Sequence, residues 1–333
     1  MIDRYGRNID YIRVSITDRC NLRCVYCMPK EGVSSIPHSK ILSYDEIERL
    51  VQIFAKLGIE KVKITGGEPL VRKNVASLIQ RLKKVDGIRQ VTLTTNGVAL
   101  AEQMEELAKA GIDGINLSLD TLEAEVFGKI TRRLELEKVM QGLKEALKYP
   151  KIPLKINCVP LGMPGQNVAD LAKLALDYPV SVRYIEMMPI GLGKKFSCIR
   201  EEEVLQQLKE RFGSFEKCEE SLGNGPGHYY TFPGFQGKIG FISAISHKFC
   251  ESCNRIRLTP QGYLKSCLQY DIGVDLKTLL RSGSSEECLK EAIWETIWNK
   301  PAGHQFVQQS AEQSLAQYPT EHGETHIMSQ FGG

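Results

Sequence analysis

The sequence lacks several features that would have placed it in another class of protein. No apolar run in its 333 residues approaches the ~18 residues that a membrane-spanning helix needs. The first residues, Met1 to Arg4, lack the apolar core of a secretory signal peptide. The 43 basic residues nearly balance the 40 acidic ones, and a net charge of +3 provides no basic footprint for nucleic acid. We therefore expect a cytoplasmic protein that binds neither a membrane nor a nucleic acid.

The composition is that of a globular protein, with 42% hydrophobic and 25% charged residues. A chain of this length can hold one barrel-sized domain and a smaller one. Ten cysteines without an export signal indicate a reducing compartment and metal or redox chemistry, because disulfides are rare there. Six cysteines fall in two groups, and the other four are expected to be buried or incidental thiols: Cys158, Cys198, Cys218 and Cys288.

Strand and helix patterns alternate up to about residue 212. A helix is predicted to start after Ser43, an N-cap residue that forms a capping box with Glu46, and to stop at Gly58. A second helix is predicted over 99–110. Strands are predicted at 11–16, 61–65, 90–95, 114–119, 153–159 and 180–186. Six successive strand–helix units predict a parallel sheet and an α/β fold, here an incomplete (β/α)6 TIM-type barrel.

The pattern changes from about residue 228. Short runs predict small antiparallel strands at 229–232, 238–245 and 255–258, and helical segments follow near 275–281 and 285–299. The low apolar content of the last ~30 residues predicts loose order. The predicted units are a partial barrel over 1–225, a smaller C-terminal α+β domain over 226–320 and a flexible tail over 321–333.

Three cysteines lie within eight residues, directly after the first predicted strand. The short loop that carries Cys20, Cys24 and Cys27 can place three thiolates at three corners of a cubane iron–sulfur cluster. A fully ligated cluster uses four thiolates, and three leave one iron open to a small molecule. A structural zinc site is the alternative, but zinc prefers four ligands from paired CxxC or CxxH units. The CxxxCxxC spacing therefore favours a cluster.

A second group consists of Cys250, Cys253 and, after thirteen intervening residues, Cys267. A CxxC arm with one distant cysteine is also typical of half a zinc site, and the residues alone leave zinc and a cluster both open. Arg255 and Arg257 follow on the same side of a predicted strand. Two guanidiniums there suit a polyanion such as a triphosphate, although an exposed basic strand face is the ordinary alternative.

Unusual residues also gather at the C-terminal ends of the predicted strands, where parallel α/β folds carry their chemistry. Gly66 and Gly67 let the backbone approach a ligand, and Glu68 beside them suits the ammonium group of an amino acid. The other strand-end residues are Thr94, Thr95, Asn96, Gly97, Ser118, Asp120, Asn157, Glu186 and Met188. Cations inside the strand patterns predict either exposed strand faces or a basic interior that needs an anion: Arg13, Lys63, Lys155 and Arg183.

Together these motifs resemble one family. The segment 15–29 around the first cysteines is similar to the radical S-adenosylmethionine (SAM) superfamily. Segments 64–70, 93–97 and 116–120, the run from Cys250 to Leu258 and the terminal Gly332-Gly333 resemble the MoaA family of GTP 3′,8-cyclases, which open molybdenum cofactor biosynthesis. The resemblance runs nearly end to end. It implies an enzyme with GTP as substrate and with SAM and two [4Fe–4S] clusters as cofactors, the smaller C-terminal domain binding the second cluster.

The resemblance also implies roles for individual residues. The cluster that cleaves SAM would be held by Cys20, Cys24 and Cys27, and SAM would be contacted by Tyr26, Gly67, Ser118 and Met188. A second cluster, whose open iron meets the guanine base, would be held by Cys250, Cys253 and Cys267. GTP would be contacted by Arg13, Lys63, Thr94, Lys155, Arg255 and Arg257. Lys63 stands where the family leads us to expect arginine, and a lysine keeps the charge but loses the bidentate fork. Gly332 and Gly333 would reach into the barrel and help to organise the active site.

In the family, the reaction takes a hydrogen from ribose C3′ of GTP, and the carbon radical attacks C8 of guanine. The product passes to MoaC, the downstream cyclic pyranopterin monophosphate synthase. A reductant protein and a homodimer are further expectations. One alternative is another two-cluster radical SAM enzyme such as a peptide-modifying maturase, which would carry more C-terminal cysteines and lack the Arg-x-Arg pair. Another is a zinc-stapled nucleic-acid-binding module, which would be colourless.

Overall fold

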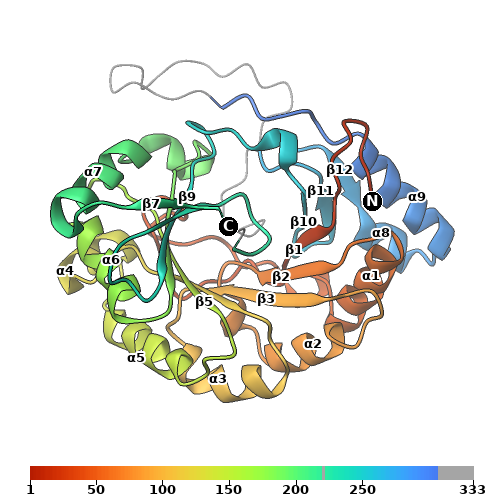
Figure 1. Ribbon diagram of the computed structural model, residues 1–333. Helices are drawn as coiled ribbons and strands as arrows, with labels where there is room; N and C mark the ends of the chain where they lie inside the picture. Colours follow the sequence, from red (N-terminus) through yellow and green to blue (C-terminus); the bar gives the residue numbers. More distant parts are fainter. Residues whose placement is uncertain (220–221, 307–333) are drawn as a thin grey trace.

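The computed structural model of this protein describes residues 1–219 and 222–306. Within these ranges a 12-stranded sheet runs in the order β12-β11-β10-β1-β2-β3-β4-β5-β6-β9-β8-β7. Figure 1 shows the strands curving around the middle of the molecule, with the helices on their outer side. None of the described helices is both long and apolar enough to cross a membrane.

The centre of the sheet consists of the six strands that the sequence predicts. Their bounds are β1 (Tyr11–Ser15), β2 (Lys61–Thr65), β3 (Gln90–Thr95), β4 (Ile115–Ser118), β5 (Leu154–Cys158) and β6 (Ser181–Ile185). Neighbours in the chain pair in parallel, from β1 through to β6. The α/β class and the parallel sheet are therefore confirmed. Because the strands are parallel, their C-terminal ends meet at one edge, where the cysteine loop also lies.

The later strands extend the same sheet at both of its edges. They are β7 (Glu216–Cys218), β8 (His228–Thr231), β9 (Lys238–Ile242), β10 (Arg255–Leu258), β11 (Tyr263–Lys265) and β12 (Gly273–Asp275). Antiparallel pairs join β7–β8–β9 and β10–β11–β12. The predicted short strands at 229–232, 238–245 and 255–258 correspond to β8, β9 and β10, whereas β7, β11 and β12 were not predicted. However, β9 also pairs in parallel with β6, and β10 pairs in parallel with β1. The sequence did not predict these two pairings, because strand partners that are distant along the chain leave no local signal.

Helices cover the outer face of the sheet. In α1 the predicted capping box is present: Glu46 N donates to Ser43 Oγ at 3.1 Å, and Ser43 N donates to Glu46 Oε2 at 2.7 Å. The predicted helix over 99–110 is α3. The helices are α1 (Tyr44–Lys56), α2 (Val75–Leu82), α3 (Leu100–Lys109), α4 (Ala124–Thr131), α5 (Leu136–Leu147), α6 (Val168–Asp177), α7 (Glu201–Phe212), α8 (Leu276–Arg281) and α9 (Glu286–Trp298).

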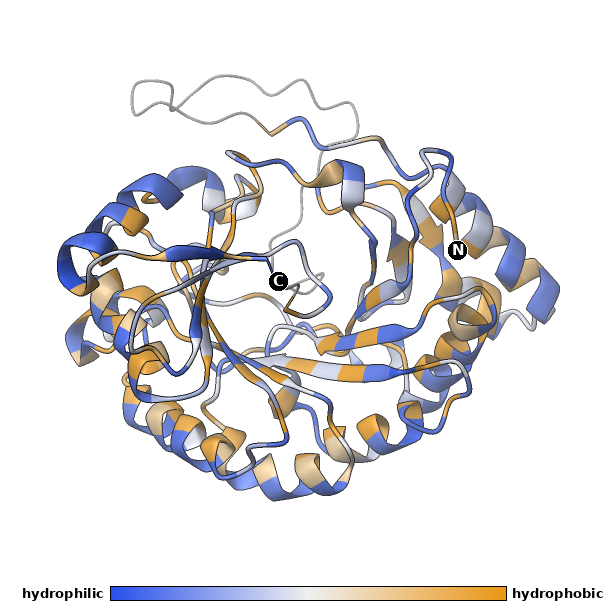
Figure 2. Cartoon of the chain, in the orientation of Figure 1, coloured by the Kyte–Doolittle hydropathy of each residue, from blue (hydrophilic) through white to orange (hydrophobic). Residues whose placement is uncertain are grey.

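The sheet has one apolar face and one polar face. In β1, Ile12 and Val14 are fully buried in the core below the helices, while Arg13 between them points to the other face. Figure 2 shows this alternation of orange and blue along the strands. The strand register places Arg13 beside Lys63 of β2 and Arg257 of β10. The period-two pattern of the sequence therefore builds a row of cations on the inner face.

Candidate active site

The cysteine loop after β1 is held by hydrogen bonds to its backbone. Arg23 N donates to Thr131 O at 2.9 Å, which ties the loop to the end of α4. Cys27 N donates to Cys24 O at 3.0 Å and closes a turn. The guanidinium of Arg23 donates to Cys20 O at 2.6 Å. Arg23 is a supporting residue that the sequence reasoning missed, because a charged residue between two cysteines gives no sign of where it folds back.

The three thiols of this loop lie close enough to influence one another. Burial raises the pKa of Cys24 well above its usual value, and the neighbouring Cys27, Asp120 and Cys20 raise it further. Burial likewise raises the pKa of Cys20 to about 11. The mutual effect of Cys20, Cys24 and Cys27 shows that the three sulfurs lie close together, and thiolates are the usual ligands of iron–sulfur clusters. The donor set therefore suits an iron–sulfur cluster.

No three His, Cys, Asp or Glu side chains of residues 1–219 and 222–306 form a group that could hold a single metal ion. A cubane cluster takes one thiolate at each of several irons, and its ligands do not need to converge on one point. The spread of the thiols is therefore compatible with a cluster.

Strand β2 ends directly against the cysteine loop. Gly67 N donates to Thr17 O at 2.7 Å, and Glu68 N donates to Arg19 O at 2.7 Å. A Cβ atom on Gly67 would lie 2.4 Å from Arg19 O, and any larger residue would push the two segments apart. The glycine thus permits a close approach of two backbones just before Cys20. Contact between Gly67 and SAM stays a prediction.

Glu68 is buried, and both of its carboxylate oxygens accept hydrogen bonds from within the protein. Oε1 accepts from Leu70 N at 2.9 Å and from Thr95 Oγ1 at 2.7 Å, and Oε2 accepts from Asn96 N at 2.6 Å. Burial raises the pKa of Glu68 to about 7, although these hydrogen bonds act in the opposite direction. The carboxylate joins the ends of β2 and β3, and its predicted contact with an ammonium group stays a prediction.

Asn96 connects this carboxylate to the cysteine loop. Its Nδ2 donates to Asn21 Oδ1 at 2.7 Å and to Cys20 Sγ at 3.7 Å. A second donor, Leu22 N, lies 3.4 Å from the same sulfur. The sequence marked Asn96 only as a strand-end residue and gave it no role.

The predicted SAM contacts lie at neighbouring strand ends. Tyr26 OH donates to Asp120 Oδ2 at 2.8 Å, which links the cysteine loop to the segment after β4. Burial raises the pKa of Asp120 to about 6, against the effect of its hydrogen bonds with Val159 N and Tyr26. Ser118 is the last residue of β4, and Met188 follows β6. All are at the edge where the parallel strands end.

The cations predicted inside the strands come together on the inner face. Burial lowers the pKa of Lys63 well below its usual value, and the positive charges of Arg183, Arg13, Lys155 and Arg255 lower it further. The prediction of a basic interior is therefore confirmed. Because like charges that share a site repel one another, this group of cations favours an anionic ligand.

Two further predicted GTP contacts lie on the same sheet. Lys155 Nζ donates to Leu222 O at 2.6 Å, and burial together with Arg183 lowers its pKa to about 8. Thr94 Oγ1 accepts from Asn116 Nδ2 at 3.5 Å across β3 and β4. Neither contact identifies the ligand, and both residues stay predicted GTP contacts.

The second cysteine group stands before β10. Cys250 begins a short turn, and Cys253 N donates to Cys250 O at 3.2 Å. Cys267 and Cys250 both raise the pKa of Tyr270, after the larger effect of its burial, which places these two cysteines near one ring. Burial raises the pKa of Cys253, but nearby cations, Lys300 first among them, outweigh this and lower it to about 6. A thiol that ionises readily suits a metal ligand.

His304 is a neighbour of this group that sequence reasoning missed. Its backbone N donates to Cys250 Sγ at 3.5 Å, and its Nε2 lies 2.7 Å from Ala244 O. Its Nδ1 is buried without a hydrogen-bond partner within the described chain. With the proton on Nε2, Nδ1 can accept a hydrogen bond or bind a metal. Since histidine is a common zinc ligand, the zinc and iron contents of the purified protein must both be measured to identify the metal at this cysteine group.

The remaining predicted residues have varied surroundings. Of the four single cysteines, Cys158 is buried, Cys198 and Cys218 are half-buried and Cys288 is exposed. Gly332 and Gly333 lie outside the described residues.

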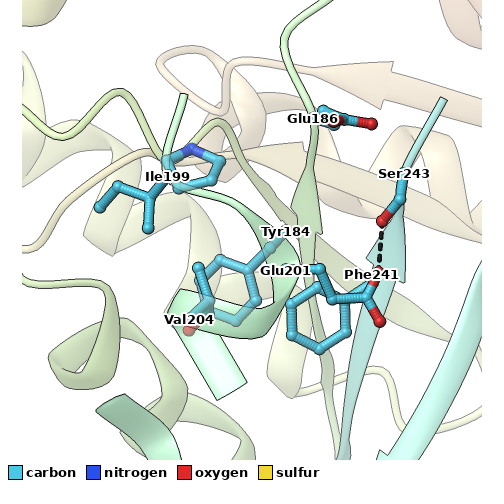
Figure 3. A pocket seen from close by; sticks show the side chains of 8 residues that line it. Tyr184, Glu186, Ile199, Glu201, Val204, Phe241 and Ser243 are labelled. Atoms are coloured by element: carbon cyan, nitrogen blue, oxygen red, sulfur yellow. Dashed lines mark hydrogen bonds between the residues drawn. The ribbon is translucent and has the colours of Figure 1, made fainter. Parts of the chain in front are cut away.

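A small cavity between α7, β6 and β9 is not a nucleotide site (Figure 3). Its volume of about 10 Å³ suffices for one water molecule. Its wall contains Glu201, which accepts a hydrogen bond from Ser243 Oγ and lies 2.6 Å from His228 Nε2. These contacts hold the start of α7 against β8 and the segment after β9.

Two family models match the chain. The radical SAM superfamily matches residues 14–177, and Molybdenum Cofactor Synthesis C matches residues 180–306. A crystal structure of Streptococcus suis SuiB bound to precursor peptide SuiA has the same fold, with a TM-score of 0.59 and 15% identity over 89% of this chain and 66% of that one. The sheet and the three-cysteine loop thus define a protein of the radical SAM superfamily.

The relatives are more specific. GTP 3′,8-cyclase of Desulforamulus reducens is 46% identical over 91% of this chain and 95% of its own. That of Clostridium perfringens is 44% identical over 92% and 95%, and that of Heliobacterium modesticaldum is 42% identical over 100% of both chains. The chain belongs to the GTP 3′,8-cyclase family, radical SAM enzymes of molybdenum cofactor biosynthesis.

Proposed function

We propose that this chain performs the family's reaction, the cyclisation of GTP to (8S)-3′,8-cyclo-7,8-dihydroguanosine 5′-triphosphate, with the residues that the sequence predicted. One observation carries the assignment of residues. Strand β1 has Arg13 on its inner face and leads directly into the loop of Cys20. The site for an anion and the site for a cluster therefore share one face and one edge of the sheet.

The first cluster site consists of Cys20, Cys24 and Cys27. A [4Fe–4S] cluster bound there supplies the electron that cleaves SAM. The loop, fixed by Arg23 and α4, holds the three thiols in place and leaves one iron for the ligand. Four residues at the adjoining strand ends are the proposed SAM contacts: Tyr26, Gly67, Ser118 and Met188.

The inner face of the sheet is the proposed GTP site. Its cations hold the triphosphate by charge-assisted hydrogen bonds, and this anion relieves their mutual repulsion. The proposed contacts are Arg13, Lys63, Thr94, Lys155, Arg255 and Arg257. Lys63 contributes a point charge in place of a bidentate fork.

A second [4Fe–4S] cluster is proposed at Cys250, Cys253 and Cys267, where its open iron meets the guanine base. The lowered pKa of Cys253 and the position of Arg255 two residues after it support a metal centre beside the substrate. The proposed arrangement is an incomplete (β/α)6 barrel over 1–225 with a cluster-binding part over 226–320. It is supported by the sheet order, in which β12 and β7 stand at opposite ends of the described sheet.

The proposal includes partners that complete the pathway. The triphosphate product passes to MoaC, the cyclic pyranopterin monophosphate synthase, and a reductant protein reduces the first cluster. We also propose a cytoplasmic location and a homodimer. The tail over 321–333 is proposed to bring Gly332 and Gly333 to the active site.

The test uses the full chain purified without oxygen. We expect about eight irons per chain and no zinc if two four-iron clusters form. With SAM, a reductant and GTP deuterated at ribose C3′, the deuterium should appear in 5′-deoxyadenosine. GTP deuterated at ribose C2′ serves as the control and should transfer none. A chain that binds zinc and leaves GTP unchanged would contradict the proposal.

Cysteine variants separate the two centres. Replacement of Cys20, Cys24 or Cys27 by Ala should abolish reductive cleavage of SAM, whereas Cys288→Ala, at an exposed position, should not. Replacement of Cys250, Cys253 or Cys267 by Ala should end GTP turnover but leave slow uncoupled cleavage of SAM. Full GTP cyclisation in the second set would show that no second cluster serves the substrate.

A further inference from the structure

Two buried cations lie outside the cation row and have no role in the reaction proposed above. Arg7 and Lys300 are 5% and 3% exposed. Arg7 precedes β1 and Lys300 follows α9, so that they come from opposite parts of the chain. Buried charges are unfavourable unless hydrogen bonds and opposite charges compensate them. Both residues donate hydrogen bonds to the backbone at or beside the second cysteine group.

Arg7 ties the N-terminal segment to Cys250. Its Nε lies 2.6 Å from Oδ2 of Asp3, which is 2% exposed. Its Nη1 donates to Cys250 O and to Ala302 O, both at 3.0 Å, and its Nη2 donates to Pro301 O at 2.8 Å. The planar guanidinium therefore holds the first cysteine turn against the segment after α9.

Lys300 ties the other two cysteines. Its Nζ donates to Arg255 O at 2.9 Å, two residues after Cys253, and to Ser266 O, just before Cys267. In the described part of the chain both of these hydrogen bonds of Lys300 end on backbone carbonyls, and Lys300 has no ion pair with a carboxylate there. The ammonium charge therefore remains available to an anionic group bound by the three thiols.

We propose that Arg7 and Lys300 are positioning residues for the second cluster. They fix the backbone at Cys250, at Arg255 after Cys253 and at Ser266 before Cys267, and Lys300 adds a positive charge beside these cysteines. This inference rests on the proposed function, because it assumes that these cysteines bind a cluster. A cluster held by three thiolates carries negative charge, so a buried ammonium stabilises the bound cluster and favours its reduced form.

The test isolates the second cluster in a full-length chain with Cys20, Cys24 and Cys27 all replaced by Ala. In this background we compare Lys300→Met, which keeps the length of the side chain but removes the charge, with Lys300→Arg, which keeps the charge. Lys83→Met is the matched control, because Lys83 is half-buried at the end of α2 and pairs with Asp113 at 2.7 Å, away from the second cysteine group. The readouts are iron per chain, the rate of iron loss to a chelator and the reduction potential.

Lys300→Met should speed iron loss by about tenfold to a hundredfold, the range for one charge-assisted hydrogen bond, and shift the potential to more negative values. Lys300→Arg should keep both the rate of iron loss and the reduction potential close to those of the background chain. Lys83→Met should leave both quantities unchanged. Arg7→Met should also speed iron loss, with partial recovery in Arg7→Lys. If Lys300→Met and Lys300→Arg behave alike, whether both keep the cluster or both fail to load, charge is not what matters and the inference is overturned.

The same experiment gives a different result if the proposed function itself is wrong. If the background chain itself carries zinc or no iron, there is no second cluster, whatever Lys300 does. If the background loads about four irons and Lys300→Met holds them as firmly as the background does, the two-cluster proposal survives and only the role of Lys300 is lost.

Discussion

Asn96 Nδ2 lies 3.7 Å from Cys20 Sγ, and the backbone N–H of the same residue donates to the buried carboxylate of Glu68 at 2.6 Å. One residue therefore connects the end of β2 to a cysteine of the first group. Hydrogen bonds to cluster sulfurs raise the reduction potential, because they stabilise the more negative reduced form. The contact between Asn96 and Cys20 thus bears on the electron transfer that SAM cleavage requires.

Replacement of Asn96 by Ala should shift the potential of the first cluster to more negative values by tens of millivolts, since one weak hydrogen bond is worth about 1 kcal/mol. A redox titration followed by electron paramagnetic resonance, in a chain with the second cysteine group removed, measures this shift. Gln141→Ala, an exposed change on α5, is the control. An unchanged potential in Asn96→Ala would show that the contact does not affect the cluster.

The arginine pair on β10 should dominate GTP binding. Arg257 is 8% exposed and lies in register with Arg13, and the guanidinium of Arg255 stacks over Phe249 at 4.8 Å. A charge-assisted hydrogen bond is worth ~1.5–3 kcal/mol, so that Arg255→Ala or Arg257→Ala should weaken GTP binding by about tenfold to a hundredfold.

Equilibrium titrations with GTP and with SAM measure this effect. SAM affinity should change little in both variants. Arg81→Ala is the matched control, because Arg81 is paired with Asp45 and Glu48 on the outer helices. Unchanged GTP affinity in the β10 variants would return both residues to the role of an ordinary basic strand face.

Glu68 should make the stability of the cluster-free protein depend on pH. Burial raises its pKa from 4.5 to about 7 in the folded chain, so that the folded state binds this proton more tightly than the unfolded state. Its contribution to stability is fully present below pH 4.5 and is lost as the pH rises through about 7. Glu68→Gln carries no charge at any pH and should escape this loss.

The free energy of unfolding of Glu68→Gln should therefore rise relative to that of the parent, by up to about 3 kcal/mol between about pH 4.5 and pH 8. Urea titrations of both proteins under reducing conditions give this difference at each pH. A constant difference across the range would mean that Glu68 is ionised throughout, held so by Leu70, Thr95 and Asn96.

The sequence predicts the elements of this fold much better than their long-range contacts. Strands β1 to β6 lie within about one or two residues of the predicted bounds, because alternation, caps and glycine stops are local signals. The capping box of Ser43 and Glu46 is correct for the same reason. The cation row also follows from the sequence, since period-two alternation fixes the side of Arg13 and Lys63.

What the sequence misses depends on residues that are far apart in the chain. The burial of Glu68 and its reach to Asn96 could not be derived, because turn residues at a strand end look alike whether they face a ligand or a neighbouring strand. The parallel pairing of β10 with β1 and the contacts of Arg7 with Cys250 and Pro301 span more than 200 residues and leave no periodic trace.

The terminal Gly332-Gly333 should matter for catalysis, although both residues lie outside the described part of the chain. Glycines have no side chains, and two of them can enter a narrow space and place backbone groups and a carboxylate beside cations such as Arg13. Removal of both residues should therefore leave the iron content, the fold and SAM binding intact and yet end GTP cyclisation. Removal of two residues at the N-terminus is no control, because Met1 N donates to Asn8 Oδ1 and Ile9 O and is part of the structure.

A better control replaces Gly332 and Gly333 by Ala, which keeps the length and the terminal carboxylate but adds two methyl groups. If the glycines enter a narrow site, this variant should also be impaired. A synthetic peptide of the last ~11 residues, which spans roughly 35 Å when extended, should restore turnover to the truncated chain but not when its own glycines are replaced. If the truncated enzyme converts GTP as fast as the full chain under anaerobic assay, the two glycines have no part in the reaction.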